Sequence, residues 1–141
     1  MPSSILWPLI AQILWTFMLY AWLTWARVGA VRRGEVDYSC FELGREEPRA
    51  IARITRNLAN QFELPVIFYA AVVLLVATDD VTAIDVAAAW VFVAGRVIHT
   101  LVQTLTDKVE LRGRVFMISF LAVVVLVGHV VLLAFEGVGA P

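Results

Sequence analysis

Four long apolar stretches dominate the chain, and most polar residues lie at their ends or between them. Residues 1–26 and 115–135 contain no Asp, Glu, Lys or Arg, and residues 81–106 contain only two. A helix that crosses a bilayer needs about 20 residues of this kind. The remaining stretch, residues 64–78, is too short alone, so its helix must begin earlier, near Pro48. The pattern predicts four transmembrane helices, near residues 4–31, 48–78, 82–106 and 114–135.

Local sequence signals mark the starts of two of these helices. Glu46 and Glu47 precede Pro48, which places acids near the positive end of the helix dipole and proline in the first turn. Thr82 and Asp85 have the spacing of a capping box at the start of the third helix. Both signals agree with the apolar pattern.

The second predicted helix carries a proline in its interior. Pro65 cannot donate a hydrogen bond to the carbonyl of Gln61, so we expect a kink just after Glu63. Between the helices, the sequence predicts an irregular loop at residues 34–47 and a short turn at residues 106–114. A kink beside charged residues favours a pocket at this point.

The composition excludes an ordinary soluble domain. The mean hydropathy is +0.83 and 61% of the residues are hydrophobic, against about 45–50% in soluble domains. Neither a repeat nor a linker divides the chain, so residues 1–141 are predicted to form a single all-α integral membrane domain, a bundle of four transmembrane helices.

The charges are strongly segregated, although the net charge is only −1. All 11 Lys and Arg lie within residues 27–56 and 96–114, whereas the connection at residues 78–85 carries three Asp and no cation. Cytoplasmic connections of membrane proteins are enriched in Lys and Arg. We therefore expect both termini outside the cytoplasm, in a multi-pass protein of a bacterial inner membrane or an equivalent bilayer.

The second helix carries a polar stripe, made of Arg53, Arg56, Asn60 and Glu63, directly ahead of an apolar stretch. At 100° per residue these positions fall within an arc of about 80°. Ionisable groups in a bilayer are costly, so they usually face the bundle interior or mark a ligand site.

The third helix carries a second polar stripe. Arg96, His99 and Gln103 lie within about 60° of one another, and Arg112 and Arg114 follow just past its end. Arginine is always charged and binds carboxylates or phosphates through two parallel hydrogen bonds. Together the two stripes favour a site for a small polyanionic molecule that also forms hydrogen bonds.

A purely structural interpretation is the alternative. In it, Arg32, Arg33 and Arg114 set the topology and extend to the lipid headgroups. Arg56, Glu63 and Arg96 then neutralise one another as interhelical ion pairs. The pattern alone leaves both interpretations open. We expect no metal site, because two His and one Cys make no plausible ligand set, and no nucleic-acid partner.

The stretch RNLANQFELPVIF resembles the signature of the MAPEG family, the membrane-associated proteins of eicosanoid and glutathione metabolism. The matching positions of the signature are Arg56, Asn60, Glu63, Pro65 and Phe68.

Two further stretches resemble one branch of that family, the microsomal glutathione transferases and prostaglandin E synthases. GRVIHT at residues 95–100 is similar to the third-helix motif of the branch, and VRR at residues 31–33 resembles the basic end of its first helix. Arg112 falls where the branch places an arginine beside the glutathione sulfur. The resemblance thus covers three helices and the turn into the fourth.

The resemblance implies a homotrimer of four-helix bundles that binds glutathione between subunits at the cytoplasmic side. The stripes and the resemblance together give the candidate binding residues: Arg32, Arg53, Arg56, Asn60, Glu63, His99 and Gln103. Arg112 is the candidate catalytic residue, because a neighbouring cation lowers the pKa of a thiol and the thiolate is the nucleophile.

The favoured hypothesis is an enzyme, a glutathione-dependent membrane transferase or peroxidase acting on lipophilic electrophiles dissolved in the bilayer. Gln103 stands where the branch commonly has Tyr, and Gly113 where some members have a functional Ser. These departures keep open a non-catalytic MAPEG-type protein that binds lipid or assists a partner. A small multidrug exporter is disfavoured, because such transporters need an acidic residue in the first helix and residues 1–26 have none.

Overall fold

The computed structural model describes residues 2–42 and 45–139, with the side chains of residues 4–42 and 45–136. The described chain is helical, as predicted from the apolar pattern. Its elements are α1 (Pro2–Arg32), the 3-10 turn η1 (Tyr38–Phe41), α2 (Arg49–Ala59), the 3-10 turn η2 (Asn60–Phe62), α3 (Leu64–Ala77), α4 (Ala83–Leu105) and α5 (Val109–Gly139). Four segments are long and apolar enough to cross a membrane: Ser4–Arg32, Arg49–Ala77, Ala83–Leu105 and Val109–Glu136. The prediction of four long apolar helices is confirmed.

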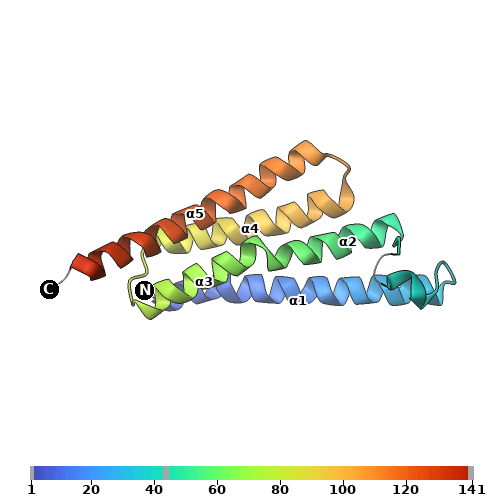
Figure 1. Ribbon diagram of the computed structural model, residues 1–141, viewed down its shortest axis with the longest axis horizontal. Coiled ribbons are helices and arrows are strands. Elements are labelled where there is room, and N and C mark those ends of the chain that lie inside the picture. Colours follow the sequence, from blue (N-terminus) through green and yellow to red (C-terminus); the bar gives the residue numbers. More distant parts are fainter. Residues whose placement is uncertain (1, 43–44, 140–141) are drawn as a thin grey trace.

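The helices lie side by side, so that the bundle has two chemically distinct ends (Figure 1). Both termini and the α3–α4 connection lie at one end, which we call the acidic end because it carries Asp79, Asp80, Asp85 and Glu136. The α1–α2 and α4–α5 connections lie at the other end. We call it the basic end because the Lys and Arg residues of both connections gather there. The acidic end thus carries acids and no Lys or Arg, whereas the basic end carries cations together with several acids, among them Glu47 and Asp107.

The second predicted span is broken rather than merely bent. The α-helix α2 ends at Ala59, η2 follows, and Glu63 has φ −104° and ψ −102° before α3 begins at Leu64. Pro65 therefore lies in the first turn of α3, where its missing N–H is tolerated. The proline disrupts the helix at the predicted place, and the break leaves Glu63 between two helical segments.

The fourth span begins earlier than expected. Residues 106–114 were predicted to be a turn, but α5 starts at Val109 and continues to Gly139. Lys108 N donates to Thr106 Oγ1 at 3.3 Å, and Glu110 lies in the first helical turn, where an acid is favourable. Arg112 and Arg114 are consequently helical residues of α5, not residues of a loop.

The start of α2 is joined to α1 through Glu47. The carboxylate of Glu47 pairs with Arg27 Nη2 and accepts a hydrogen bond of 2.6 Å from Thr55 Oγ1. Arg27 also lies over the ring of Phe41, with its Cζ 5.0 Å from the ring centroid. These contacts hold the loop after α1 against the bundle.

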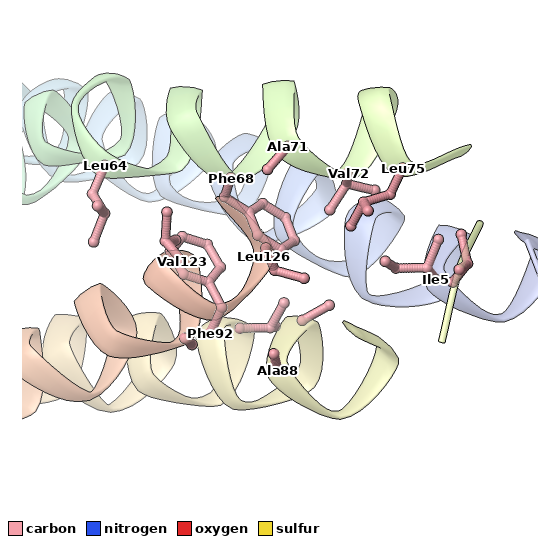
Figure 2. Packing of buried hydrophobic residues seen from close by; sticks show 14 residues of the cluster. Ile5, Leu64, Phe68, Ala71, Val72, Leu75, Ala88, Phe92, Val123 and Leu126 are labelled. Atoms are coloured by element: carbon pink, nitrogen blue, oxygen red, sulfur yellow. The ribbon is translucent and has the colours of Figure 1, made fainter. Parts of the chain in front are cut away.

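The main apolar core lies toward the acidic end, between α1, α3, α4 and α5 (Figure 2). Phe68 of α3 stacks on Phe92 of α4 with ring centroids 4.2 Å apart, and Leu126 of α5 packs in the same cluster. The helices α4 and α5 approach closely at Gly95, where a Cβ would lie 2.4 Å from Ser119 Oγ. Small residues permit such close approach between membrane helices.

Candidate functional site

A cavity of about 250 Å³ opens at the basic end between α2, the end of α4 and the start of α5. We call it the basic cavity. Its polar lining consists of five cations, one acid and one amide: Arg49, Arg53, Arg56, Lys108, Arg112, Asp107 and Gln103. Each helix supplies its part from one face, because residues three and four apart in a helix share a side.

One carboxylate neutralises only two of these cations. Asp107 Oδ1 accepts from Arg49 Nη2 at 2.7 Å and also pairs with Arg53 Nη2. Arg53 Nη1 donates to the Thr104 carbonyl at 3.3 Å. The other three cations, Arg56, Lys108 and Arg112, form no ion pair with any described residue. The cavity therefore keeps an excess of positive charge that can meet an anion.

The amide of Gln103 forms the inner wall of the cavity. Its Oε1 accepts from Asn60 Nδ2 at 3.2 Å and from Asn57 Nδ2 at 3.5 Å. Its Nε2 is buried and has no hydrogen-bond partner within the described chain. A buried N–H group without a partner is costly, by about 1–3 kcal/mol. Gln103, which lines the basic cavity, thus has one buried donor without a partner in the described chain.

Behind Gln103, a chain of buried polar side chains runs from α4 to α1. Thr100 Oγ1 donates to Asn57 Oδ1 at 3.0 Å, and Gln61 Nε2 donates to the Asn57 carbonyl at 3.2 Å. Gln12 Nε2 of α1 then donates to Gln61 Oε1 at 3.1 Å. Sequence reasoning missed these four residues. The signal was a polar residue in an otherwise apolar stretch, as at Gln12.

Arg96 and His99 lie inside the bundle rather than in the basic cavity. Arg96 is completely buried, and its Nη2 donates to the Asn60 carbonyl at 3.0 Å. Arg96 Nε, Arg96 Nη1 and His99 Nδ1 have no partner among the described residues. The His99 ring packs edge-on against Phe116, with centroids 6.1 Å apart. The predicted stripe on α4 is therefore real, and only Gln103 of its members lines the cavity.

Besides Asn60 and His99, two more candidate binding residues lie outside the lining of the cavity. Arg32 is exposed at the end of α1, and Glu63 is exposed at the helix break. The structure thus brings together Arg53, Arg56, Gln103 and Arg112, with Asn60 hydrogen-bonded to Gln103.

The structural alternative required ion pairs among Arg56, Glu63 and Arg96. None of these three side chains forms an ion pair with a residue that the structure describes. Arg96 instead donates to the backbone carbonyl of Asn60, the residue that caps the end of α2. Carbonyls at the end of a helix lack partners within that helix. Direct ion pairs within one described chain therefore do not account for the polar stripes.

Comparison with known proteins identifies the family to which the chain belongs. No curated protein and no solved structure matches the chain. The model of the MAPEG family matches residues 5–132, which is most of the chain. Together with the four apolar helices, this match establishes an integral membrane protein. The chain belongs to the MAPEG family.

Proposed function

We propose that the protein is a membrane glutathione transferase or peroxidase that binds glutathione in the basic cavity. Three unpaired cations and the free Gln103 donor in one cavity carry this proposal. Membership of the MAPEG family, whose proteins act in glutathione and eicosanoid metabolism, supports it. On the resemblance of GRVIHT and VRR, we assign the protein to the branch that contains the microsomal glutathione transferases and prostaglandin E synthases.

The chemistry of glutathione fits the groups that line the cavity. The tripeptide has two carboxylates, a thiol, an ammonium group and two peptide bonds. Arg56 and Lys108 offer charge to the carboxylates, and Gln103 Nε2 offers a donor to a peptide carbonyl. Charge-assisted hydrogen bonds of this kind are about twice as strong as neutral ones. An apolar ligand would leave all of these groups desolvated and unpaired.

The two exposed candidate residues are assigned to a site shared between subunits. Arg32 and Glu63 are exposed and lie outside the cavity of their own chain, so we assign them to glutathione held at the contact between two copies of a homotrimer. In that arrangement Glu63 accepts from the ammonium group and Arg32 binds a carboxylate. Native mass spectrometry of the detergent-solubilised protein tests the assembly, and a clean monomer or dimer at micromolar concentration contradicts it.

Arg112 is assigned to the sulfur. In the transferase reaction, glutathione supplies the nucleophile after its thiol proton has passed to water. The thiolate forms a carbon–sulfur bond with the electrophile while the bond from that carbon to its leaving group breaks, and the leaving group departs as an anion. Arg112 lies on the first turns of α5 at the cavity wall, where its guanidinium favours the charged form of a thiol beside it. The lipophilic electrophile reaches this end of the bundle from the bilayer.

Calorimetry with glutathione tests the proposal, followed by an ultraviolet titration of the thiolate in the complex. We expect saturable binding, and a thiolate that forms at lower pH than in free glutathione. S-methylglutathione serves as the matched control, since it keeps both carboxylates and forms no thiolate. Absence of glutathione binding would contradict the proposal.

A non-catalytic MAPEG-type protein is the second candidate, and the bonding of Gln103 favours it. The branch commonly has Tyr at this position, whereas here the amide joins α2 to α4 through Asn57 and Asn60. In this case the protein binds lipid or assists a partner. Glutathione binding without thiolate formation or turnover would select this candidate.

A further inference from the structure

A buried pair of side chains at the acidic end plays no part in the proposed glutathione site. Asp85 of α4 is 1% exposed, and its two carboxylate oxygens lie 3.0 and 2.9 Å from His129 Nδ1 of α5. The carboxylate also accepts from Thr82 N at 2.8 Å and from Thr82 Oγ1 at 2.6 Å. The predicted capping box is thus confirmed, and His129 adds a link between α4 and α5.

The hydrogen bond of His129 Nδ1 determines whether His129 Nε2 is a donor or an acceptor in the neutral ring. Because Nδ1 faces a carboxylate, Nδ1 carries the proton in the neutral ring, and Nε2 on the opposite edge holds a lone pair. No described residue forms a hydrogen bond with His129 Nε2. With a neutral ring, the pair therefore presents one acceptor, supported by a buried negative charge.

An apolar groove of about 550 Å³ runs beside this pair between α4 and α5. Ile84, Val124, Val125 and Leu132 form its apolar walls, and Asp85 and His129 lie along it. Gly128 also lines the groove, and a Cβ built on it would meet no atom within 4 Å. Because Gly128 has no side chain, this part of the groove is open, and His129 is the next residue along the chain.

The charge around the groove limits what it can bind. The acidic end carries four acids, and the chain has no Lys or Arg between Arg56 and Arg96 or after Arg114. A phosphate or carboxylate head group would meet only negative charge there. A head group that donates hydrogen bonds and carries positive charge complements the acceptor Nε2, and the buried carboxylate of Asp85 behind the ring favours that positive charge through space.

We infer that the groove binds a single-chain amphiphile with an ammonium head group. The ammonium group lies against the Asp85–His129 pair, and the alkyl chain follows the apolar walls. This site is separate from the basic cavity, which takes a polyanion at the opposite end of the bundle. The inference is independent of the proposed glutathione chemistry.

A set of matched photoaffinity probes tests the inference in neutral detergent micelles. The probe is a dodecylammonium ion with a diazirine at the end of its chain, compared with the alcohol and the carboxylate of the same length. We expect saturable labelling of the groove by the ammonium probe, mapped by mass spectrometry of peptides. Its half-saturation concentration should be at least about tenfold lower than that of either other probe, as expected for a charge-assisted hydrogen bond.

Three variants separate a ligand site from a purely structural pair. Gly128→Leu fills the groove without touching the Asp85–His129 pair, and should abolish saturable labelling while the helix gains a better helix former. Asp85→Asn should weaken labelling by tenfold or more, whereas Asp80→Asn, an exposed acid at the same end, should change it less than twofold. The inference is overturned by equal labelling from all three probes, by unchanged labelling in Gly128→Leu, or by a lack of saturable labelling. The last result would indicate that another copy covers the groove.

Discussion

At the basic end of the bundle, two arginines share the carboxylate of Asp107, and three further cations of the basic cavity have no partner within the described chain. At the acidic end, Asp85 is surrounded by donors from Thr82 and His129, and the adjoining groove is apolar. Both ends place charge in apolar helices, where it is costly. The difference lies in the groups left without partners: several cations at one end, one acceptor at the other. Those groups, rather than the total charge, indicate the class of ligand.

The largest expected effect comes from Arg112, and it tests whether the unpaired cations act in catalysis. Arg112→Ala should lower kcat/KM for a generic lipophilic electrophile by about 100- to 1,000-fold, the scale for loss of one group that stabilises developing charge. Because the cation favours the thiolate, its removal should raise the pH at which thiolate absorbance appears. Glutathione affinity should change less than tenfold.

Arg114→Ala is the matched control for Arg112. Arg114 lies on the same helix, its side chain is 79% exposed, and it pairs with Glu110 at 3.8 Å. We expect nearly full activity in this variant. An equal loss in both variants would point to a general effect of charge or folding, and full activity in Arg112→Ala would remove Arg112 from the mechanism.

A second comparison contrasts an unpaired and a paired cation within the basic cavity. Arg56→Ala should weaken glutathione binding by some tens of fold, about 2 kcal/mol, because a charged contact to the ligand is lost. Arg49→Ala should weaken it only a few fold, since Arg49 already pairs with Asp107. Calorimetry measures both, and equal losses would mean that pairing does not decide which cations bind.

Glu63 extends this comparison to the proposed contact between subunits. Glu63→Gln should weaken glutathione binding to a degree similar to Arg56→Ala, because its carboxylate is assigned to the ammonium group. The thermal stability of both variants is measured alongside their glutathione affinity. If both variants keep their affinity and lose stability instead, the two residues are structural, and the ligand site must lie elsewhere.

At the acidic end, the expected effect of a substitution is on stability. His129→Ala removes a hydrogen bond to a buried carboxylate and should lower the free energy of unfolding by about 1.5–3 kcal/mol. Asp85 keeps its bonds to Thr82, which limits the loss. Thermal unfolding in detergent measures the change. Glutathione affinity should stay the same, and a parallel loss of affinity would show that the two ends are not independent.

The smallest expected effect distinguishes two neighbouring arginines at the end of α1. Arg33 Nε lies 2.5 Å from Glu35 Oε1, and this hydrogen bond lowers the pKa of Glu35 below its usual value. The pair is therefore intact at neutral pH and is lost only as the pH falls through that lowered pKa. Arg32→Ala should weaken glutathione binding several fold, and Arg33→Ala less than twofold, as measured by calorimetry. The reverse order would contradict the role assigned to Arg32.

The spans were predictable from the sequence because a bilayer demands long uninterrupted apolar runs. The start of α5 was not, because residues 106–114 are rich in charge, and charged residues favour a turn as readily as an exposed first helical turn. The spacing of Glu110 and Arg114, four residues apart, was the available helical signal.

The candidate site was predictable only in part. Helical periodicity placed Arg53 and Arg56 on one face, but pairing depends on contacts between distant residues. Asp107 lies 54 residues from Arg53, and His129 lies 44 residues from Asp85. Spacing within one helix does not reveal such partners. Spacing within one helix also did not reveal that the fold buries His99 inside the bundle, and its role in binding stays a prediction.

The break between α2 and α3 has a consequence for anyone who wishes to straighten this span. Arg96 occupies the carbonyl of Asn60, the acceptor that the amide of Leu64 would use in a continuous helix. Pro65 separately prevents the next hydrogen bond of that helix. The break is thus stabilised from two places, once within the segment and once from a neighbouring helix. A carbonyl oxygen can accept two hydrogen bonds, so replacing Pro65 would allow the helical bonds to form only if the Asn60 oxygen can turn toward Leu64 while it still accepts from Arg96.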